Sequence, residues 1–240
     1  MILKFGIKHD LLSEQPLEIK FPPIQAQHEI EVLNKGNQRK IMEFVKSNFT
    51  FRNLGIYICL SSGLRIGEVC ALTWDDIDTD LRVITITKTI QRIYLPNEKD
   101  KTKIIIDTPK SKNSIRKIPM SYELCKMIKP LKKVVNGAFY VLSNSAIPTE
   151  PRTYRNYYKR LIKELDIPPM KFHGMRHSFA TRCIECNCDY KTVSVLLGHS
   201  DISTTLNLYV HPNMEQKRLC IERMSKSLKK QHKTENKRGL

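Results

Sequence analysis

The spacing of the apolar residues changes twice along this chain, and each change limits the structures that it can adopt. From residue 35 to residue 72 apolar side chains recur every three or four positions, which predicts amphipathic helices. Between residues 83 and 119 they stand in short runs rich in isoleucine, valine and threonine, separated by polar turns, which predicts strands. Helical spacing then returns, so we expect a mostly α-helical α+β fold with a small antiparallel β-sheet inserted between helices. The expected helices span residues 35–48, 52–62, 65–72, 122–134, 153–165, 175–186, 190–197, 202–210 and 214–228.

The two ends of the chain differ from this body. Apolar residues at helical spacing before residue 13 predict a fragment of a helix, and three prolines within 13–28 predict an extended linker. We therefore expect residues 1–29 to be the end of an upstream domain followed by an interdomain linker, which makes the chain a fragment. The main domain is expected over 30–228, and the basic stretch 229–240 is expected to be a disordered tail.

The charge of the chain points to a polyanionic partner. Lysine and arginine number 41 against 24 aspartates and glutamates, a formal net charge of +17. Nucleic acid is the first candidate for such a partner, and an anionic membrane surface is the second. No run of about 18 apolar residues exists, so we expect no membrane-spanning helix, and the charges near residue 8 lead us to expect no signal peptide. The 7 cysteines are an odd number without a small disulfide scaffold, so we expect reduced thiols in a cytoplasmic protein.

Four short patterns hold residue types that bind or attack phosphate. Each has an ordinary explanation when taken alone: a surface arginine at a helix start, a solvated basic turn, paired polar groups, or a half-buried tyrosine. Together they combine guanidinium, ammonium, imidazole and phenol groups in one basic chain. The patterns are Gly63-Leu64-Arg65-Ile66-Gly67-Glu68, the turn with Lys110, Lys112 and Arg116, His173-Gly174-Met175-Arg176-His177, and Leu197-Gly198-His199 followed by Tyr209.

Such a set suits a phosphodiester. Arginine binds non-bridging phosphate oxygens in a bidentate manner and neutralises the charge that builds on phosphorus, where many nucleases use a metal ion. Histidine moves protons near neutral pH. A tyrosine hydroxyl, with an ordinary pKa of about 10, attacks phosphorus once neighbouring cations favour the phenolate. No metal-binding motif accompanies these residues, and we expect neither a metal nor another cofactor.

With Leu72-Thr73-Trp74-Asp75-Asp76 and Thr108-Pro109-Lys110 added, these motifs resemble the catalytic domain of the tyrosine recombinases, or phage integrase family. The resemblance covers about residues 30–215 and is nearest to integrases of conjugative transposons and temperate phages. It implies the tyrosine recombinase catalytic-domain fold. It also implies site-specific DNA cutting and rejoining through a 3′-phosphotyrosyl intermediate, without ATP or metal, for the integration or excision of a mobile element.

The resemblance assigns four residues to the scissile phosphate. Arg65 and Arg176 are similar to the two catalytic arginines that clamp it. His173 corresponds to the proton-transferring histidine, and His199 to the second histidine, which hydrogen-bonds the phosphate. His177 follows Arg176 directly and therefore points about 100° away on a helix, so we expect it to be structural.

The same resemblance makes Tyr209 the nucleophile and Lys110 the acid that protonates the leaving 5′-hydroxyl. Lys112 lies in the same turn and is the alternative acid, although Lys110 follows directly on the expected strand, as the family's lysine does. Lys112 and Arg116 are also candidates for DNA binding. Glu68 is expected to support the site by pairing with a catalytic base or arginine.

The expected partners are double-stranded DNA at recombination sites, three further copies in a synaptic homotetramer, and DNA-bending accessory proteins. The expected location is the cytoplasm, in association with the nucleoid. The helix at 214–228 is expected either to dock on a neighbouring protomer or to pack on its own domain. DNA binding by this chain alone is expected to be weak and salt-sensitive. The rival functions are a type IB topoisomerase, an inactive integrase relic that only binds DNA, and, more distantly, a membrane-surface protein.

Three cysteines, Cys183, Cys186 and Cys188, resemble a metal cluster in their spacing. They fall within one expected helix and its exit, and no second Cys-x-x-Cys pair follows at zinc-finger spacing. We therefore interpret them as small buried hydrophobic residues and not as a zinc site.

Overall fold

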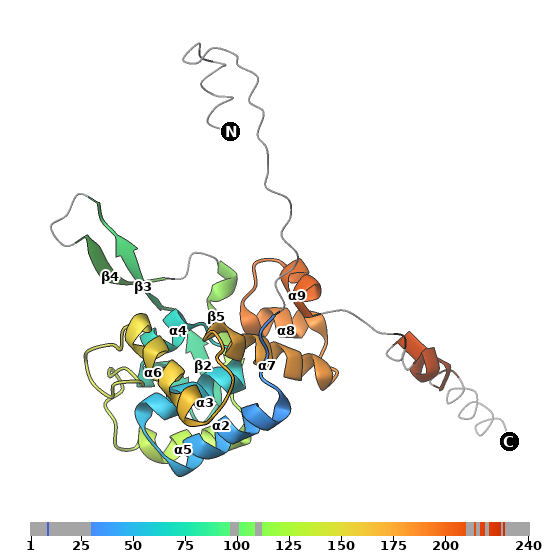
Figure 1. Ribbon diagram of the computed structural model, residues 1–240, viewed down its shortest axis with the longest axis horizontal. Coiled ribbons are helices and arrows are strands. Elements are labelled where there is room, and N and C mark those ends of the chain that lie inside the picture. Colours follow the sequence, from blue (N-terminus) through green and yellow to red (C-terminus); the bar gives the residue numbers. More distant parts are fainter. Residues whose placement is uncertain are drawn as a thin grey trace.

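A computed structural model gives the arrangement of the chain (Figure 1). It describes residues 30–96, 101–108 and 112–209, together with residue 9 and positions 214, 217, 218, 221–226 and 228. Except for residue 9, the segment 1–29 lies outside the described residues, as does 229–240. The domain assignments made for those two segments therefore stay predictions.

Within the described ranges the helices follow the predicted periodicity closely. The N-cap residue Thr50 explains one start, because its hydroxyl accepts a hydrogen bond from the Asn53 amide at 3.0 Å. Gly63 ends the same helix in the left-handed conformation, with φ of +67°. The helices are α2 Lys35–Ser47, α3 Phe51–Ser62, α4 Ile66–Ala71, α5 Tyr122–Lys132, α6 Pro151–Glu164, α7 His173–Glu185, α8 Tyr190–Leu197 and α9 Ile202–Tyr209.

The strands form two antiparallel sheets, where the sequence predicted one. The first sheet has three strands in the order β1-β2-β5, and the second is the β3–β4 hairpin. The hairpin projects from the body (Figure 1) and leaves Ile104 and Ile106 exposed, so its apolar run does not extend the buried sheet. The strands are β1 Ile77–Asp78, β2 Val83–Ile86, β3 Thr89–Tyr94, β4 Thr102–Asp107 and β5 Arg116–Pro119.

One large hydrophobic core holds the body together. Trp74, Tyr57 and Tyr154 are among its largest fully buried side chains, and it joins α2–α6 to the three-stranded sheet. A smaller cluster of Ala180, Val193 and Leu197 lies between α7 and α8. These two helices and α9 pack together beside the main core (Figure 1), so the predicted mostly α-helical α+β class is confirmed.

The described part of 214–228 is helical and exposes its apolar side chains, including Met214, Ile221 and Leu228. Docking of this segment on a neighbouring protomer therefore stays a prediction. Among the described residues, no helix is long and apolar enough to cross a membrane.

Candidate active site

Three arginines from three elements converge on the carboxyl end of α8. Arg116 lies on β5, Arg65 precedes α4, and Arg176 lies on α7. They donate, in that order, to the carbonyl oxygens of Leu196, Gly198 and Leu197, at 2.7, 3.0 and 2.7 Å. The last carbonyls of a helix lack partners within the helix and lie at the negative end of its dipole, so cations bind them well. The end of α8 therefore gathers three positive groups in one place.

Two glycines make this close approach possible. Gly63 and Gly198 end their helices in the left-handed conformation, at φ of +67° and +65°. The Gly63 carbonyl accepts from Arg176 Nη1 at 2.9 Å, and a Cβ on Gly198 would lie 3.0 Å from Arg116 Nη1. Sequence reasoning gave these glycines no role in the site. The available signal was a glycine at the end of each helical pattern: Gly198 directly follows Leu197, and Gly63 follows two serines after Leu60.

Glu68 links two of the arginines. Its carboxylate is 2% exposed and accepts two hydrogen bonds of 2.9 Å from the Arg116 guanidinium, one of 2.9 Å from the Arg65 guanidinium and one of 2.8 Å from the Arg65 amide. Burial opposes ionisation of Glu68, but the hydrogen bonds and charges of Arg116 and Arg65 outweigh it and hold its pKa below the ordinary value. The expected pairing of Glu68 with an arginine is thus present.

The surroundings of Arg116 do not fit the DNA-binding role that the sequence suggested for it. Its side chain is 4% exposed, because Glu68 and the Leu196 carbonyl enclose it. Its guanidinium donates to both Glu68 carboxylate oxygens and to the carbonyls of Leu196 and Ser114, so its charge is already neutralised and its donors are taken up within the protein. We therefore interpret Arg116 as a residue that positions Glu68 and α8, in place of the predicted DNA contact.

The amino-terminal turn of α7 carries two of the candidates on one face. His173 and Arg176 stand three positions apart, the spacing at which helical side chains are neighbours. Arg176 is buried, whereas His173 is exposed. Desolvation, His177, Arg176 and Arg65 together lower the pKa of His173 to about 4. The His177 ring packs edge-on against His173, with centroids 4.6 Å apart, in agreement with a structural contribution.

His199 comes directly after Gly198, the residue that caps α8, and is held by α9. Its Nδ1 lies 2.8 Å from the hydroxyl of Thr205, which is fully buried. Desolvation, followed by the charges of Arg176 and Arg65, lowers the pKa of His199 to about 4. The positive charges of the two arginines therefore act on both imidazoles, which are neutral at pH 7 in the free protein.

This neutrality predicts a pH-dependent stability. Because the folded pKa values of His173 and His199 lie below the ordinary value, the unfolded chain binds more protons between about pH 4 and 6.5. Stability should rise with pH across that window and level off above it. Urea unfolding at several pH values should show a smaller rise for His173→Gln and for His199→Gln than for the parent. An equal rise in all three proteins would contradict the assignment.

Three predicted residues cannot be placed in this cluster. Lys110 lies outside the described residues, and so do the side chains of Lys112 and Tyr209. The backbone of Lys112 opens a short 3-10 turn, and Tyr209 is the last residue of α9, the helix whose Thr205 contacts His199. The nucleophile and the choice between the two lysines stay predictions.

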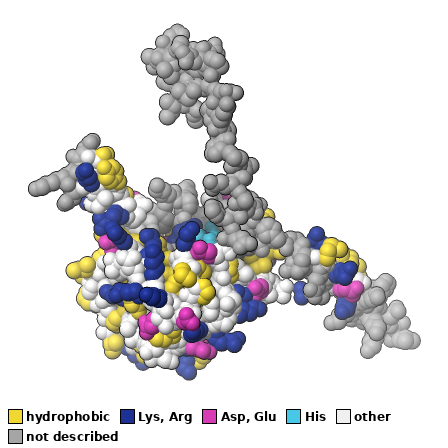
Figure 2. Space-filling model, in the orientation of Figure 1, with side chains coloured by type: hydrophobic (Ala, Val, Ile, Leu, Met, Phe, Trp, Pro, Cys, Tyr) yellow, Lys and Arg dark blue, Asp and Glu magenta, His cyan; other side chains and the backbone are white. Residues whose placement is uncertain are grey.

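A basic cleft leads away from His173 along α6. A hollow of about 450 Å³ is lined by His173, Arg155 and Lys159, and a neighbouring hollow of about 580 Å³ shares Arg155 and Lys159 and adds Arg152 and Arg92. Figure 2 shows lysine and arginine side chains gathered on this face of the body, below the β3–β4 hairpin.

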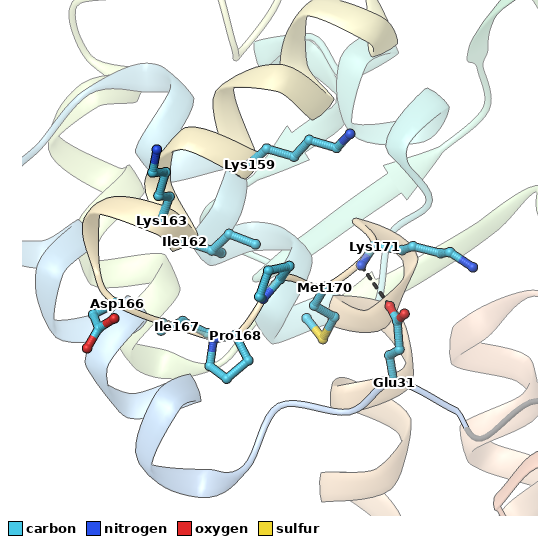
Figure 3. Close-up of a pocket in the computed structure, with 10 residues that line it drawn as sticks. Glu31, Lys159, Ile162, Lys163, Asp166, Ile167, Pro168, Met170 and Lys171 are labelled. Atoms are coloured by element: carbon cyan, nitrogen blue, oxygen red, sulfur yellow. Dashed lines mark hydrogen bonds between the residues drawn. The ribbon is translucent and has the colours of Figure 1, made fainter.

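A larger cavity of about 910 Å³ lies between the end of α6, the loop after it and the segment that holds Glu31 (Figure 3). Its floor is apolar, with Ile162 and Met170. Its rim shares Lys159 and Lys171 with the cleft at His173, and the Lys171 amide donates to Glu31 at 2.7 Å. None of the predicted site residues lines it.

The interpretation of the three cysteines as small buried hydrophobic residues is wrong. Cys186 and Cys188 are exposed, and Cys183 is half-buried, so the three are not small buried hydrophobic residues. The helix ends at Glu185, Cys186 caps it, and the turn that follows lies at the surface. In the part of the chain that the structure describes, no group of three or more histidine, cysteine or carboxylate side chains has a geometry that could hold a metal ion.

Several curated proteins resemble this chain. A XerC-like tyrosine recombinase of Caldanaerobacter subterraneus is 32% identical over 222 residues, which cover 85% of this chain and 56% of the relative. The ICEBs1 integrase of Bacillus subtilis is 29% identical over 172 residues, covering 66% and 45%. The chain thus spans about half the length of these relatives.

Solved structures share the fold. The Tn1549 transposon integrase, in complex with a circular intermediate DNA, is 25% identical with a TM-score of 0.72, covering 92% of this chain and 75% of that one. XerA recombinase has the same fold at 22% identity, with a TM-score of 0.59 and coverage of 92% and 72%. The model of the phage integrase family matches residues 31–216, most of the chain. The resemblance inferred from the motifs is confirmed, and the chain belongs to the phage integrase family of tyrosine recombinases.

Proposed function

We propose that this chain carries the DNA-cutting and rejoining chemistry of a site-specific recombinase that integrates or excises a mobile element. The observation that carries the proposal is the cluster of Arg65, Arg176, His173 and His199, drawn together from distant positions around the carboxyl end of α8. Membership of the family and the DNA-bound Tn1549 integrase support the same function.

In the proposed reaction Arg65 and Arg176 bind the non-bridging oxygens of the scissile phosphate. Their positive charges offset the negative charge that grows on those oxygens as phosphorus becomes five-coordinate. His199 donates a hydrogen bond to the same phosphate, since Thr205 fixes the orientation of its ring. His173 is neutral before the reaction and accepts a proton as the attacking hydroxyl loses it.

Tyr209 is the proposed nucleophile. Its phenolic oxygen forms a bond to phosphorus, the bond to the 5′-oxygen breaks, and Lys110 supplies the proton that the leaving 5′-hydroxyl takes up. A 5′-hydroxyl of a partner strand then attacks the phosphotyrosyl bond and releases the tyrosine. Every phosphoester bond broken is replaced by another, so the cycle consumes no ATP.

The basic cleft along α6 is the proposed path of the DNA backbone away from the scissile phosphate. Arg152, Arg155 and Lys159 stand three and four positions apart on exposed turns of α6, and the last two line the same hollow as His173. Residues at these spacings share a helix face. Contacts of this kind position DNA without reading its sequence.

Neutralising part of this path should weaken binding in a salt-dependent way. The affinity for DNA falls as salt rises. Arg155→Ala combined with Lys159→Ala should make this fall less steep, reducing the magnitude of the slope of log affinity against log salt by about 1 for each phosphate that is no longer neutralised. Fluorescence anisotropy with a duplex of unrelated sequence measures this slope. Lys126→Ala combined with Lys129→Ala is the matched control, because these lysines of α5 line a separate hollow that shares no residue with the proposed path. Equal slopes for both double variants would argue against the proposed path.

We further propose that full recombination uses four copies of the complete protein on two duplexes, with DNA-bending accessory proteins. The exposed apolar side chains Met214, Ile221 and Leu228 are suited to a contact between neighbouring protomers. The proposed place of action is the bacterial nucleoid in the cytoplasm.

A nicked suicide duplex with the end sequences of the element tests the reaction class. The nick lets the short strand diffuse away after cutting, so the protein–DNA bond is trapped. The chain, and a longer version joined to an upstream DNA-binding domain, should each give a protease-sensitive band on a denaturing gel. DNA binding by the longer protein without any covalent band would refute the recombinase proposal and favour a binding relic.

A further inference from the structure

The end of α7 closes in a turn that brings two cysteines together. The Cys188 amide donates to the Cys183 carbonyl at 3.0 Å, and the Asn187 amide donates to the Ile184 carbonyl at 2.9 Å. Asn187 adopts the left-handed conformation, at φ of +62°. These two bonds and the left-handed residue define a Schellman turn, a geometry that commonly brings the side chains at the positions of Cys183 and Cys188 into contact.

The thiol groups occupy different environments within this pair. Cys183 is half-buried and packs against the small cluster of Ala180, Val193 and Leu197, whereas Cys188 is exposed. The Cys188 thiol lies within hydrogen-bonding reach of the Cys183 thiol. Burial, and the neighbouring thiols of Cys188 and Cys186, raise the pKa of Cys183 to about 12. The exposed member of the pair is therefore the one that meets a reagent from solution first.

We propose that Cys183 and Cys188 form a dithiol site that reacts with low-molecular-weight disulfides and closes to an intramolecular disulfide at the end of α7. The backbone of the turn already holds the two residues side by side, so the bond can form without rearranging α7 or α8. Cys186 shares the turn, but it acts on the Cys183 thiol more weakly than Cys188 does and makes no hydrogen bond to it, so it stays a free thiol.

The chemistry is a two-step thiol–disulfide exchange. The Cys188 thiolate attacks a disulfide such as oxidised glutathione, forms a mixed disulfide and releases one thiol. Cys183 then gives up its proton and attacks the Cys188 sulfur, which releases the second thiol. The two protein thiols are oxidised, the small disulfide is reduced to two thiols, and both protons end on the released thiols. Disulfides of this exposed kind in reducing compartments are transient and serve as sensors.

A tryptic peptide provides a direct test, because residues 183–191 hold all three cysteines and lie between two cleavage sites, Arg182 and Lys191. The intact chain is equilibrated with oxidised glutathione, its free thiols are alkylated, and the peptide is sequenced by tandem mass spectrometry. We expect the peptide to lose two hydrogen atoms and to carry one alkyl group, on Cys186. An alkyl group on Cys183 or Cys188, three alkyl groups, or a glutathione adduct alone would each overturn the proposal.

Matched serine variants assign the pair independently. Cys188→Ser and Cys183→Ser should each abolish the internal disulfide, whereas Cys186→Ser should keep it. Far-UV circular dichroism checks that the three variants retain the parent's helix content. Retention of the bond in Cys188→Ser, or its loss in a folded Cys186→Ser, would show that another pair reacts.

Discussion

Replacing Arg65 with alanine should lower the rate of covalent DNA linkage by about 10²- to 10³-fold, the usual effect of removing one donor to a developing oxyanion. Arg65 is the more exposed of the two clamping arginines, with 36% of its side chain accessible, and its guanidinium is oriented by Glu68 and the Gly198 carbonyl. The substitution removes the positive charge that Arg65 places beside the phosphate, and it leaves the Glu68–Arg116 ion pair in place. Single-turnover trapping on the suicide duplex measures the rate.

A modified substrate tests whether Arg65 acts through its charge. A methylphosphonate at the scissile position replaces a charged oxygen with a neutral methyl group, so less positive charge is needed around phosphorus. Arg65→Ala should then recover much of its lost rate relative to the parent. Arg52→Ala is the control, because Arg52 lies exposed on α3 beside Tyr157 and should behave as the parent on both duplexes. A rate deficit that the neutral substrate leaves unchanged would mean that Arg65 does not act through charge.

Replacing Glu68 with glutamine should destabilise the fold by about 3–5 kcal/mol, because it leaves a buried guanidinium without its counter-charge. The side chain of Arg116 is 4% exposed, and both of its terminal nitrogens donate hydrogen bonds to the Glu68 carboxylate. Urea unfolding at pH 7 measures the change in stability. Asp80→Asn is the control: Asp80 forms an ion pair with Lys129 at the surface, where its side chain is 88% exposed, and should show no resolvable change.

The same carboxylate gives a pH signature. The pKa of Glu68 is lower in the folded than in the unfolded chain, so its stabilisation is present above the unfolded pKa and is lost as pH falls through the folded value. Glu68→Gln should lack that part of the acid sensitivity. The double variant Glu68→Leu with Arg116→Met should be more stable than Glu68→Gln, since it removes both buried charges. A double variant less stable than Glu68→Gln would contradict this explanation.

The sequence predicted the helices well because their signals are local. The apolar residues of α3 repeat at helical spacing, Thr50 caps its start and Gly63 ends it, and all three signals lie within or directly beside the helix itself. The hairpin was harder to predict. The apolar run that contains Ile104 and Ile106 predicts a strand. No local signal, however, shows that β3 and β4 pair only with each other and project from the body.

The candidate site could be predicted as a set of residue types but not as an arrangement. Arg116 and Glu68 stand 48 positions apart, and only the packing of β5 against α4 and α8 buries their ion pair. The convergence of three arginines on consecutive carbonyls also depends on tertiary contacts. The exposure of Cys188 likewise depends on the turn at Asn187, which ends α7 and brings the chain to the surface.

The central claim is that Tyr209 joins this arginine–histidine cluster as the nucleophile, and mapping the trapped bond tests it most directly. The tryptic peptide 192–217 contains Tyr209 as its only tyrosine. We expect that the nucleotide remnant lies on Tyr209, that Tyr209→Phe gives no covalent product, and that Tyr190→Phe behaves as the parent. A remnant on any other residue, or an undiminished band from Tyr209→Phe, would contradict this claim.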